Sequence, residues 1–93
     1  MNFEWNKNKS RSNKEKHGIF FEEAISLWKN THIRIDTVAK TVQDEKRHAV
    51  IGEIDDKVLI AFWTKRKNKI RIISVRRARD AEKKAYYKKI QNI

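Results

Sequence analysis

Two arginines in the last third of the chain, Arg71 and Arg76, are the side chains best suited to hold a phosphate group. A guanidinium group presents a planar fork of donors that matches phosphate oxygens. The two are five positions apart, so regular strand alternation sends them to opposite faces unless the strand ends or bulges before Arg76. The alternative is that they lie on a solvated strand face or form a salt bridge with Glu82.

Glu82 and Tyr86 lie four positions apart in a predicted helix, one above the other. A carboxylate base or a phenol at these positions could meet the arginines and transfer a proton. The alternative is structural: Glu82 pairs with an arginine and fixes the helix on the sheet, while Tyr86 packs with its hydroxyl in water.

His17 is a third candidate for proton transfer, and Lys16 beside it could steady a phosphate. A histidine just before Gly18 is also expected as the C-terminal cap of a helix. Together with the arginines, these residues supply a base, a cation and an acid for RNA cleavage by attack of its own 2′-hydroxyl group.

Metal chemistry is disfavoured by the spacing of the usual ligands. His17, His32 and His48 are far apart, and no paired-carboxylate or HExxH motif accompanies them. The chain has no cysteine, which excludes disulfides and thiolate metal sites. We expect neither a metal ion nor a cofactor.

The positive charge is concentrated at one end of the sequence. The formal net charge is +11, and residues 65–93 hold 12 of the 23 Lys and Arg residues but 2 of the 12 Asp and Glu residues. This distribution favours an anionic partner, with nucleic acid ahead of acidic proteins or a merely solvated face. Arg66 and Arg77 in this region, and Arg47 before it, are candidates for contacts with an RNA backbone, although arginines near turns, such as Arg47 and Arg66, are usually just solvated.

With 93 residues, the chain is expected to form one domain, residues 1–93, with one modest core. No apolar stretch approaches the roughly 20 residues of a membrane span, and the first residues lack the pattern of a secretory signal. We therefore expect a cytoplasmic protein without a membrane partner.

The hydrophobic pattern predicts an α+β fold with two N-terminal helices, an antiparallel meander and a C-terminal helix. Asn6 is the expected cap of the first helix, which runs to about Lys16 before Gly18 stops it. Apolar residues at helical spacing, with Trp28 among them, predict the second helix over residues 20–29. Strands are predicted over 31–38, 48–54, 57–64 and 70–75, with turns at 55–56 and 66–69, and the last helix over 79–91. The strand 57–64 is apolar on both faces, which predicts a central position, and Trp63 within it is expected in the core.

Three ordered blocks of residues resemble the BrnT family of toxins. The first comprises Phe3, Trp5, Asn6, Lys9, Asn13, Lys16, His17, Gly18, Ile19, Phe21, Glu23 and Ala24. The second comprises Arg47, Ile51 and Gly52, and the third comprises residues 71–76 with Ala78, Glu82 and Tyr86. The family usually has Asp in place of Asn6 and Ala in place of Val75, and both are mild departures.

The resemblance implies a ribonuclease with the fold of RelE-like toxins. It also implies a BrnA-like antitoxin of the ribbon-helix-helix type that inhibits the toxin in a hetero-oligomer. Operator DNA would be contacted only through this antitoxin. Two other readings stay open from the residues themselves: a non-catalytic, basic nucleic-acid-binding module, and a degenerate family member that only binds its antitoxin.

Overall fold

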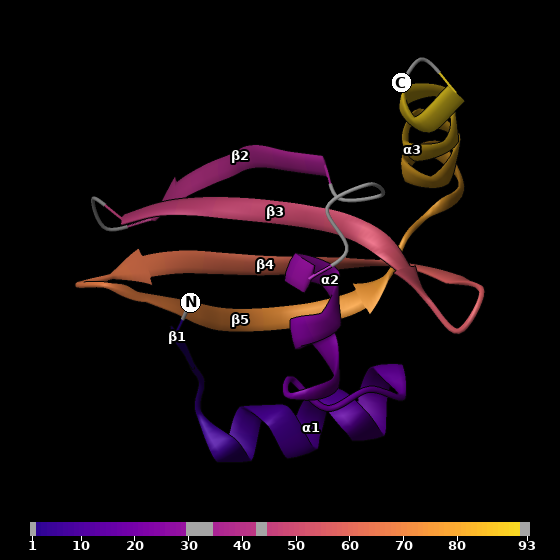
Figure 1. Ribbon diagram of the computed structural model, residues 1–93. Helices are drawn as coiled ribbons and strands as arrows, with labels where there is room; N and C mark the ends of the chain where they lie inside the picture. The colour runs from indigo at the N-terminus through magenta and orange to yellow at the C-terminus, as the bar shows by residue number, and fades with distance from the viewer. Residues whose placement is uncertain (1, 30–34, 43–44, 92–93) are drawn as a thin grey trace.

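A computed structural model describes residues 2–29, 35–42 and 45–91 of the chain, and Figure 1 shows their arrangement. The elements in chain order are β1 (Asn2–Glu4), α1 (Lys7–His17), a 3₁₀ turn (Glu23–Ile25), α2 (Ser26–Lys29), β2 (Ile35–Val42), β3 (Glu45–Ile54), β4 (Lys57–Arg66), β5 (Lys69–Arg77) and α3 (Asp80–Gln91). The predicted α+β class and the meander are confirmed. Residues 31–34 of the first predicted strand lie outside the described residues.

The five strands form one sheet in the order β1-β5-β4-β3-β2, so the predicted central position of residues 57–64 is confirmed. Strands β2 to β5 pair antiparallel, whereas β1 pairs parallel to β5, with Phe3 opposite Ile70. The meander is antiparallel as predicted, and β1 adds one parallel strand at its edge. The short segment after the N-terminus pairs with a strand more than sixty positions away, which local patterns do not reveal.

Helix α1 is held by polar contacts rather than by an apolar stripe. Asn6 caps its start by accepting a hydrogen bond from the Lys9 backbone at 3.1 Å, and Gly18 ends it at φ 79°. Its two buried side chains are Ser10 and Asn13. Asn13 accepts a hydrogen bond from the Val75 backbone and donates one to the Ile19 carbonyl, which fixes α1 along the free edge of β5 (Figure 1).

The second predicted helix is shorter than expected and consists of the 3₁₀ turn followed by the single turn of α2. Its apolar face is buried as predicted, with Phe21 and Ala24 almost inaccessible and Trp28 also in the core. These residues pack on one face of the sheet together with Leu59, Ala61, Ile72 and Val75. This face is called the helix face below.

Helix α3 packs on the opposite face of the sheet, where Tyr86 and Ile90 contact a second apolar cluster that includes Ile51 and Ile60. Tyr86 is fully buried there and Ala78 lies in the same cluster, whereas Ala81 and Ala85 of α3 are exposed. The two faces of the sheet are thus covered by different helices, and α3 covers only part of its side (Figure 1).

Candidate functional site

Four arginines of the meander lie on one face of the sheet, the face on which α3 packs. In β4, side chains alternate between the two faces, so Arg66 points to the same face as Ile60 and Phe62. Both of those residues belong to the apolar cluster beneath α3 or pack against it. In β3, Arg47 alternates in step with Ala49 of the same cluster. In β5, Arg71 pairs with Thr64 and Arg76 pairs with Ile60. The arginine face is defined here by Arg47, Arg66, Arg71 and Arg76.

A bulge in β5 brings Arg71 and Arg76 to the same face. The partners of Phe62 and Trp63 are Ser74 and Ile72, so Ile73 is an extra residue without a partner in β4. The two arginines are therefore opposite Thr64 and Ile60, which share a face because β4 itself is regular. The possibility of a bulge before Arg76, left open by the sequence, is what the structure shows.

Arg47 and Arg71 lie on either side of Thr64 and form a row across three strands. His48 pairs with Trp63, so the antiparallel ladder brings its neighbour Arg47 beside Thr64. The Cα atoms of two residues two strands apart are separated by about 10 Å, a distance that two arginine side chains can close around one phosphate. Among the described residues, the buried Nε atom of Arg47 has no hydrogen-bond partner.

Glu4 of β1 extends this row and was not singled out from the sequence. It pairs with Arg71 in the parallel ladder, and its Oε2 atom accepts a hydrogen bond from Arg71 Nη1 at 2.8 Å. Both side chains are roughly a quarter exposed, so solvent and ligands can reach them. No local pattern marks Glu4, because only the β1–β5 pairing brings it to the arginine.

Arg76 is held by Glu82 in a two-pronged ion pair. Its Nη1 and Nη2 atoms donate to the two carboxylate oxygens at 2.8 and 2.9 Å, and its guanidinium lies over the Phe62 ring at 5.3 Å. The hydrogen bonds from Arg76, helped by the Arg79 backbone, lower the pKa of Glu82 to about 2. The same pairing raises the pKa of Arg76.

Glu82 also closes the first turn of α3 by accepting a hydrogen bond from the Arg79 backbone at 2.7 Å. This contact is the returning half of a capping box, in which a glutamate at the third helical position satisfies the N-cap amide. With both oxygens engaged and a pKa of about 2, Glu82 is a weak proton acceptor. The geometry corresponds to the structural alternative for this residue.

Tyr86 is fully buried in the apolar cluster beneath α3. Burial, with a contribution from Glu53, raises the pKa of its hydroxyl to about 12. The hydroxyl oxygen is inaccessible and has no hydrogen-bond partner among the described residues, so it is not in water as the structural alternative assumed. A phenol in this position contributes packing rather than a proton.

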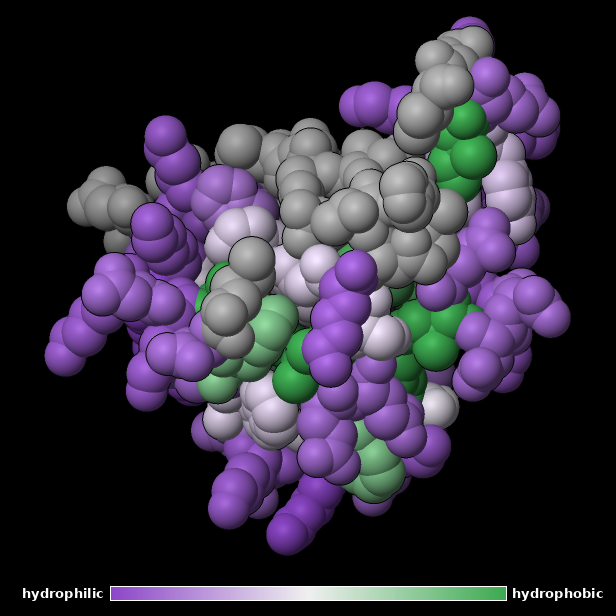
Figure 2. Space-filling view, viewed as in Figure 1, coloured by the Kyte–Doolittle hydropathy of each residue, from purple (hydrophilic) through white to green (hydrophobic). Residues whose placement is uncertain are grey.

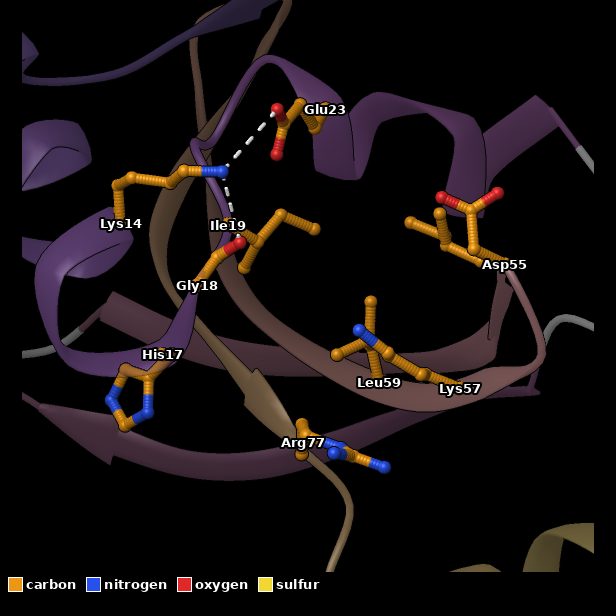
Figure 3. Close-up of a pocket in the computed structure, with 10 residues that line it drawn as sticks. Lys14, His17, Gly18, Ile19, Glu23, Asp55, Lys57, Leu59 and Arg77 are labelled. Atoms are coloured by element: carbon orange, nitrogen blue, oxygen red, sulfur yellow. Dashed lines mark hydrogen bonds and ion pairs between the residues drawn. The ribbon is translucent and has the colours of Figure 1, made fainter.

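His17 and Arg77 lie in a cleft on the helix face, away from the arginine face. Arg77 pairs with Leu59, which belongs to the helix-face cluster. The cleft has a volume of about 570 Å³, and Lys57 and Asp55 of the β3–β4 hairpin also line it. Figure 3 shows that the side chains of His17 and Arg77 do not point toward one another.

The expectation that His17 converges with Arg71 and Arg76 on one phosphodiester was wrong, because the sheet lies between them. Lys16 is exposed on α1 and does not line the cleft. Of the nine predicted site residues, the structure gathers six at the arginine face and under α3, namely Arg47, Arg66, Arg71, Arg76, Glu82 and Tyr86. The other three are Lys16, His17 and Arg77.

The two tryptophans expected in the core contact the apolar cluster on the helix face. Trp28 is buried and Trp63 is partly buried against that cluster, as predicted.

Within residues 2–29 and 45–91, whose side chains are described, no three histidine or carboxylate side chains group closely enough to hold a metal ion. No helix in the described part of the chain is long and apolar enough to cross a membrane.

Residues 5–82 match the model of a protein family described as the ribonuclease toxin, BrnT, of type II toxin-antitoxin systems. The matched stretch contains all four arginines of the arginine face together with Glu82. No curated protein matches the chain. The family match confirms the resemblance seen in the three sequence blocks.

Proposed function

Because the chain belongs to the family of BrnT ribonuclease toxins of type II toxin-antitoxin systems, we propose that it cleaves RNA on the arginine face without a metal ion. The observation that most supports this assignment is the row formed by Arg47, Thr64 and Arg71, with Glu4 at its end. It aligns Arg47, Arg71 and Glu4 on neighbouring strands, and the side chains of Arg71 and Glu4 are each about a quarter exposed.

In the proposed reaction, the 2′-hydroxyl oxygen of one nucleotide attacks the adjacent phosphorus while Glu4 accepts its proton. The bond from phosphorus to the 5′-oxygen then breaks, which leaves a 2′,3′-cyclic phosphate and a 5′-hydroxyl group. Arg47 and Arg71 stabilise the negative charge that builds on the phosphorane oxygens. Arg71 and Glu4 are partly exposed to solvent, from which the leaving oxygen takes its proton.

Arg71 suits this role because its ion pair with Glu4 leaves both groups accessible. A phosphate that binds the guanidinium competes with the carboxylate and frees it to take up a proton at the same place. Arg76 lies about four residues farther along the sheet, roughly 13 Å away at the Cα positions. We therefore assign it, with Arg66, to neighbouring phosphates of the substrate.

His17, Lys16 and Arg77 are outside this site, so the predicted catalytic role of His17 and Lys16 now requires a separate test. Glu82 and Tyr86 support the site indirectly: Glu82 orients Arg76, and Tyr86 anchors α3. We assign them positioning roles and not proton transfer.

The purified chain incubated with single-stranded RNA in excess chelator tests the reaction. We expect fragments that end in 2′,3′-cyclic phosphate, and their loss in the Arg71→Gln variant. A salt-sensitive complex with no fragments would instead identify a non-catalytic RNA-binding module.

A toxin of this class has a cognate antitoxin, and we propose a BrnA-like ribbon-helix-helix protein in this role. It would form a hetero-oligomer with the toxin and carry the contacts with operator DNA, and the pair would act in the cytoplasm, where the RNA is. Co-expression with a ribbon-helix-helix protein encoded beside the toxin should restore growth and yield a copurifying complex. Growth arrest that persists in the presence of a bound partner would contradict this assignment.

A further inference from the structure

The turn between β4 and β5 carries a cluster of cations. Lys65, Lys67 and Lys69, called the turn lysines, are all exposed, and none has a carboxylate partner among the described residues. Arg66 between them is bound by Glu45 at 3.1 Å. Figure 2 shows hydrophilic side chains gathered at the end of the molecule where this turn lies, on the left of the view.

Lys67 adopts a backbone conformation that does not favour lysine. Its φ angle is 55°, at the first position of a two-residue hairpin loop closed by Arg66 and Lys69. Positive φ is cheap for Gly, Asn and Asp but strained for a long side chain. The hairpin between β3 and β4 follows the rule, because Asp55 and Asp56 occupy its positive-φ positions.

A lysine at this position therefore costs folding stability, and it adds charge where two other exposed cations already repel it. Strain of this kind persists where the side chain serves a purpose other than folding. The purpose is best sought in a ligand that attracts several positive charges at once.

The turn continues the arginine face along the hairpin through Lys69, which pairs with Arg66, while Lys65 projects toward the opposite face of β4. The row with Arg71 lies at Thr64, Arg66 follows two residues later on the same face, and the turn begins at Lys67. A strand rises about 3.3 Å per residue, so the turn lies roughly 10 Å beyond the proposed site of cleavage. An extended polyanion held by Arg71 can reach it.

We propose that the turn lysines bind the backbone phosphates of a long RNA substrate outside the site of cleavage, an inference that rests on the proposed ribonuclease function. RNA is favoured over an acidic protein because residues 65–69 contain no apolar side chain. Protein interfaces need such a core and are depleted in lysine, whereas phosphates accept lysine as a point charge.

The test uses a variant with Lys65→Gln, Lys67→Gly and Lys69→Gln, and a control with Lys84→Gln and Lys88→Gln, two exposed lysines of α3. Binding is measured against salt with an RNA carrying 2′-O-methyl groups, which cannot be cleaved. We expect the slope of log affinity against log salt to fall by about 2 in the turn variant and to change less in the control. The single variant Lys67→Gly should melt several degrees higher while it binds this RNA more weakly.

Cleavage of two substrates separates this inference from the proposed function. The wild type should cut an RNA that spans the hairpin more efficiently than a dinucleotide, and that advantage should fall about tenfold in the turn variant. An unchanged salt slope and an unchanged length advantage would overturn the inference. It would also be overturned if the turn variant lost affinity for the antitoxin and kept its affinity for RNA. Failure of the wild type to cut either RNA would overturn the proposed function instead, with the binding result still readable.

Discussion

Arg71 and Arg76 project from the same face of β5 although five residues separate them, because Ile73 is bulged out of the ladder with β4. The Val75 amide lies in the same strand, two residues after the bulge, and donates to Asn13 Oδ1 of α1 at 3.1 Å. The helix therefore supplies a hydrogen-bond acceptor for the β5 backbone beyond the residues that pair with β1. This arrangement lets one strand supply two cations to one surface.

Asn13→Ala should destabilise the fold strongly. The substitution leaves the Val75 amide and the Ile19 carbonyl buried without partners, which costs about 2–4 kcal/mol in the free energy of unfolding. Ser12→Ala, an exposed change in the same helix, is the control and should alter stability by less than about 0.5 kcal/mol. Urea denaturation measures both, and equal stabilities would contradict the role given to Asn13.

The Arg76–Glu82 ion pair should make the free energy of unfolding depend on pH in the acid range. The pKa of Glu82 is about 2 in the folded protein against an ordinary 4.5, so the unfolded chain takes up this proton first as pH falls. The stabilisation is complete above pH 5 and is lost between about pH 5 and pH 2. At neutral pH, Glu82→Gln should lower the free energy of unfolding by about 1–3 kcal/mol. Denaturation at a series of pH values should show this difference shrinking below pH 5, and a constant difference would contradict it.

Tyr86→Phe should leave both folding and cleavage intact. The hydroxyl is buried without a hydrogen-bond partner among the described residues, so its removal should change the free energy of unfolding by no more than about 1 kcal/mol, in the stabilising direction. Cleavage by the variant should stay within about twofold of the wild type. A loss of about a hundredfold or more would restore the phenol as a proton donor.

The hydrophobic pattern was sufficient for most of the fold. The caps at Asn6 and Gly18, the turn at Asp55–Asp56 and the central strand β4 follow from residue types and are confirmed. The residue type at position 73 does not indicate the bulge, since an isoleucine fits equally well in a regular strand.

The candidate site was harder to predict than the fold. Residue chemistry identified the arginines, and the structure gathers four of them on one face. Glu4 was missed because its place depends on a pairing with distant β5. His17 was included because of its chemistry alone, and the sheet separates it from the arginines. Tertiary pairing, which no local pattern encodes, decides both cases.

Glu4→Gln tests the proton acceptor against a matched control. Glu4 and Glu45 each hold one arginine of the arginine face, Arg71 and Arg66 respectively. The proposed reaction requires only Glu4, so Glu4→Gln should lower kcat by about 10²–10⁴-fold, whereas Glu45→Gln should lower it by less than about tenfold. Similar losses in the two variants would show that the carboxylates act only by holding their arginines.

Growth arrest in cells should depend on the arginines of the arginine face. Arg71→Ala or Arg76→Ala should abolish toxicity, while Lys88→Ala on the exposed side of α3 should retain it at equal expression. The cause differs between the two arginines, because loss of Arg76 also leaves Glu82 without its partner. A melting curve of each purified variant separates loss of folding from loss of chemistry.

The most direct measurement is kcat for cleavage of a short RNA by Arg71→Lys and by His17→Ala, each shown to be folded. Lysine keeps the charge of Arg71 but not its fork of donors, and we expect a loss of about a hundredfold. His17 lies on the other side of the sheet in its own cleft, and its removal should leave kcat within about threefold of the wild type. An inactive His17→Ala beside a fully active Arg71→Lys would contradict the account and move the reaction to the cleft.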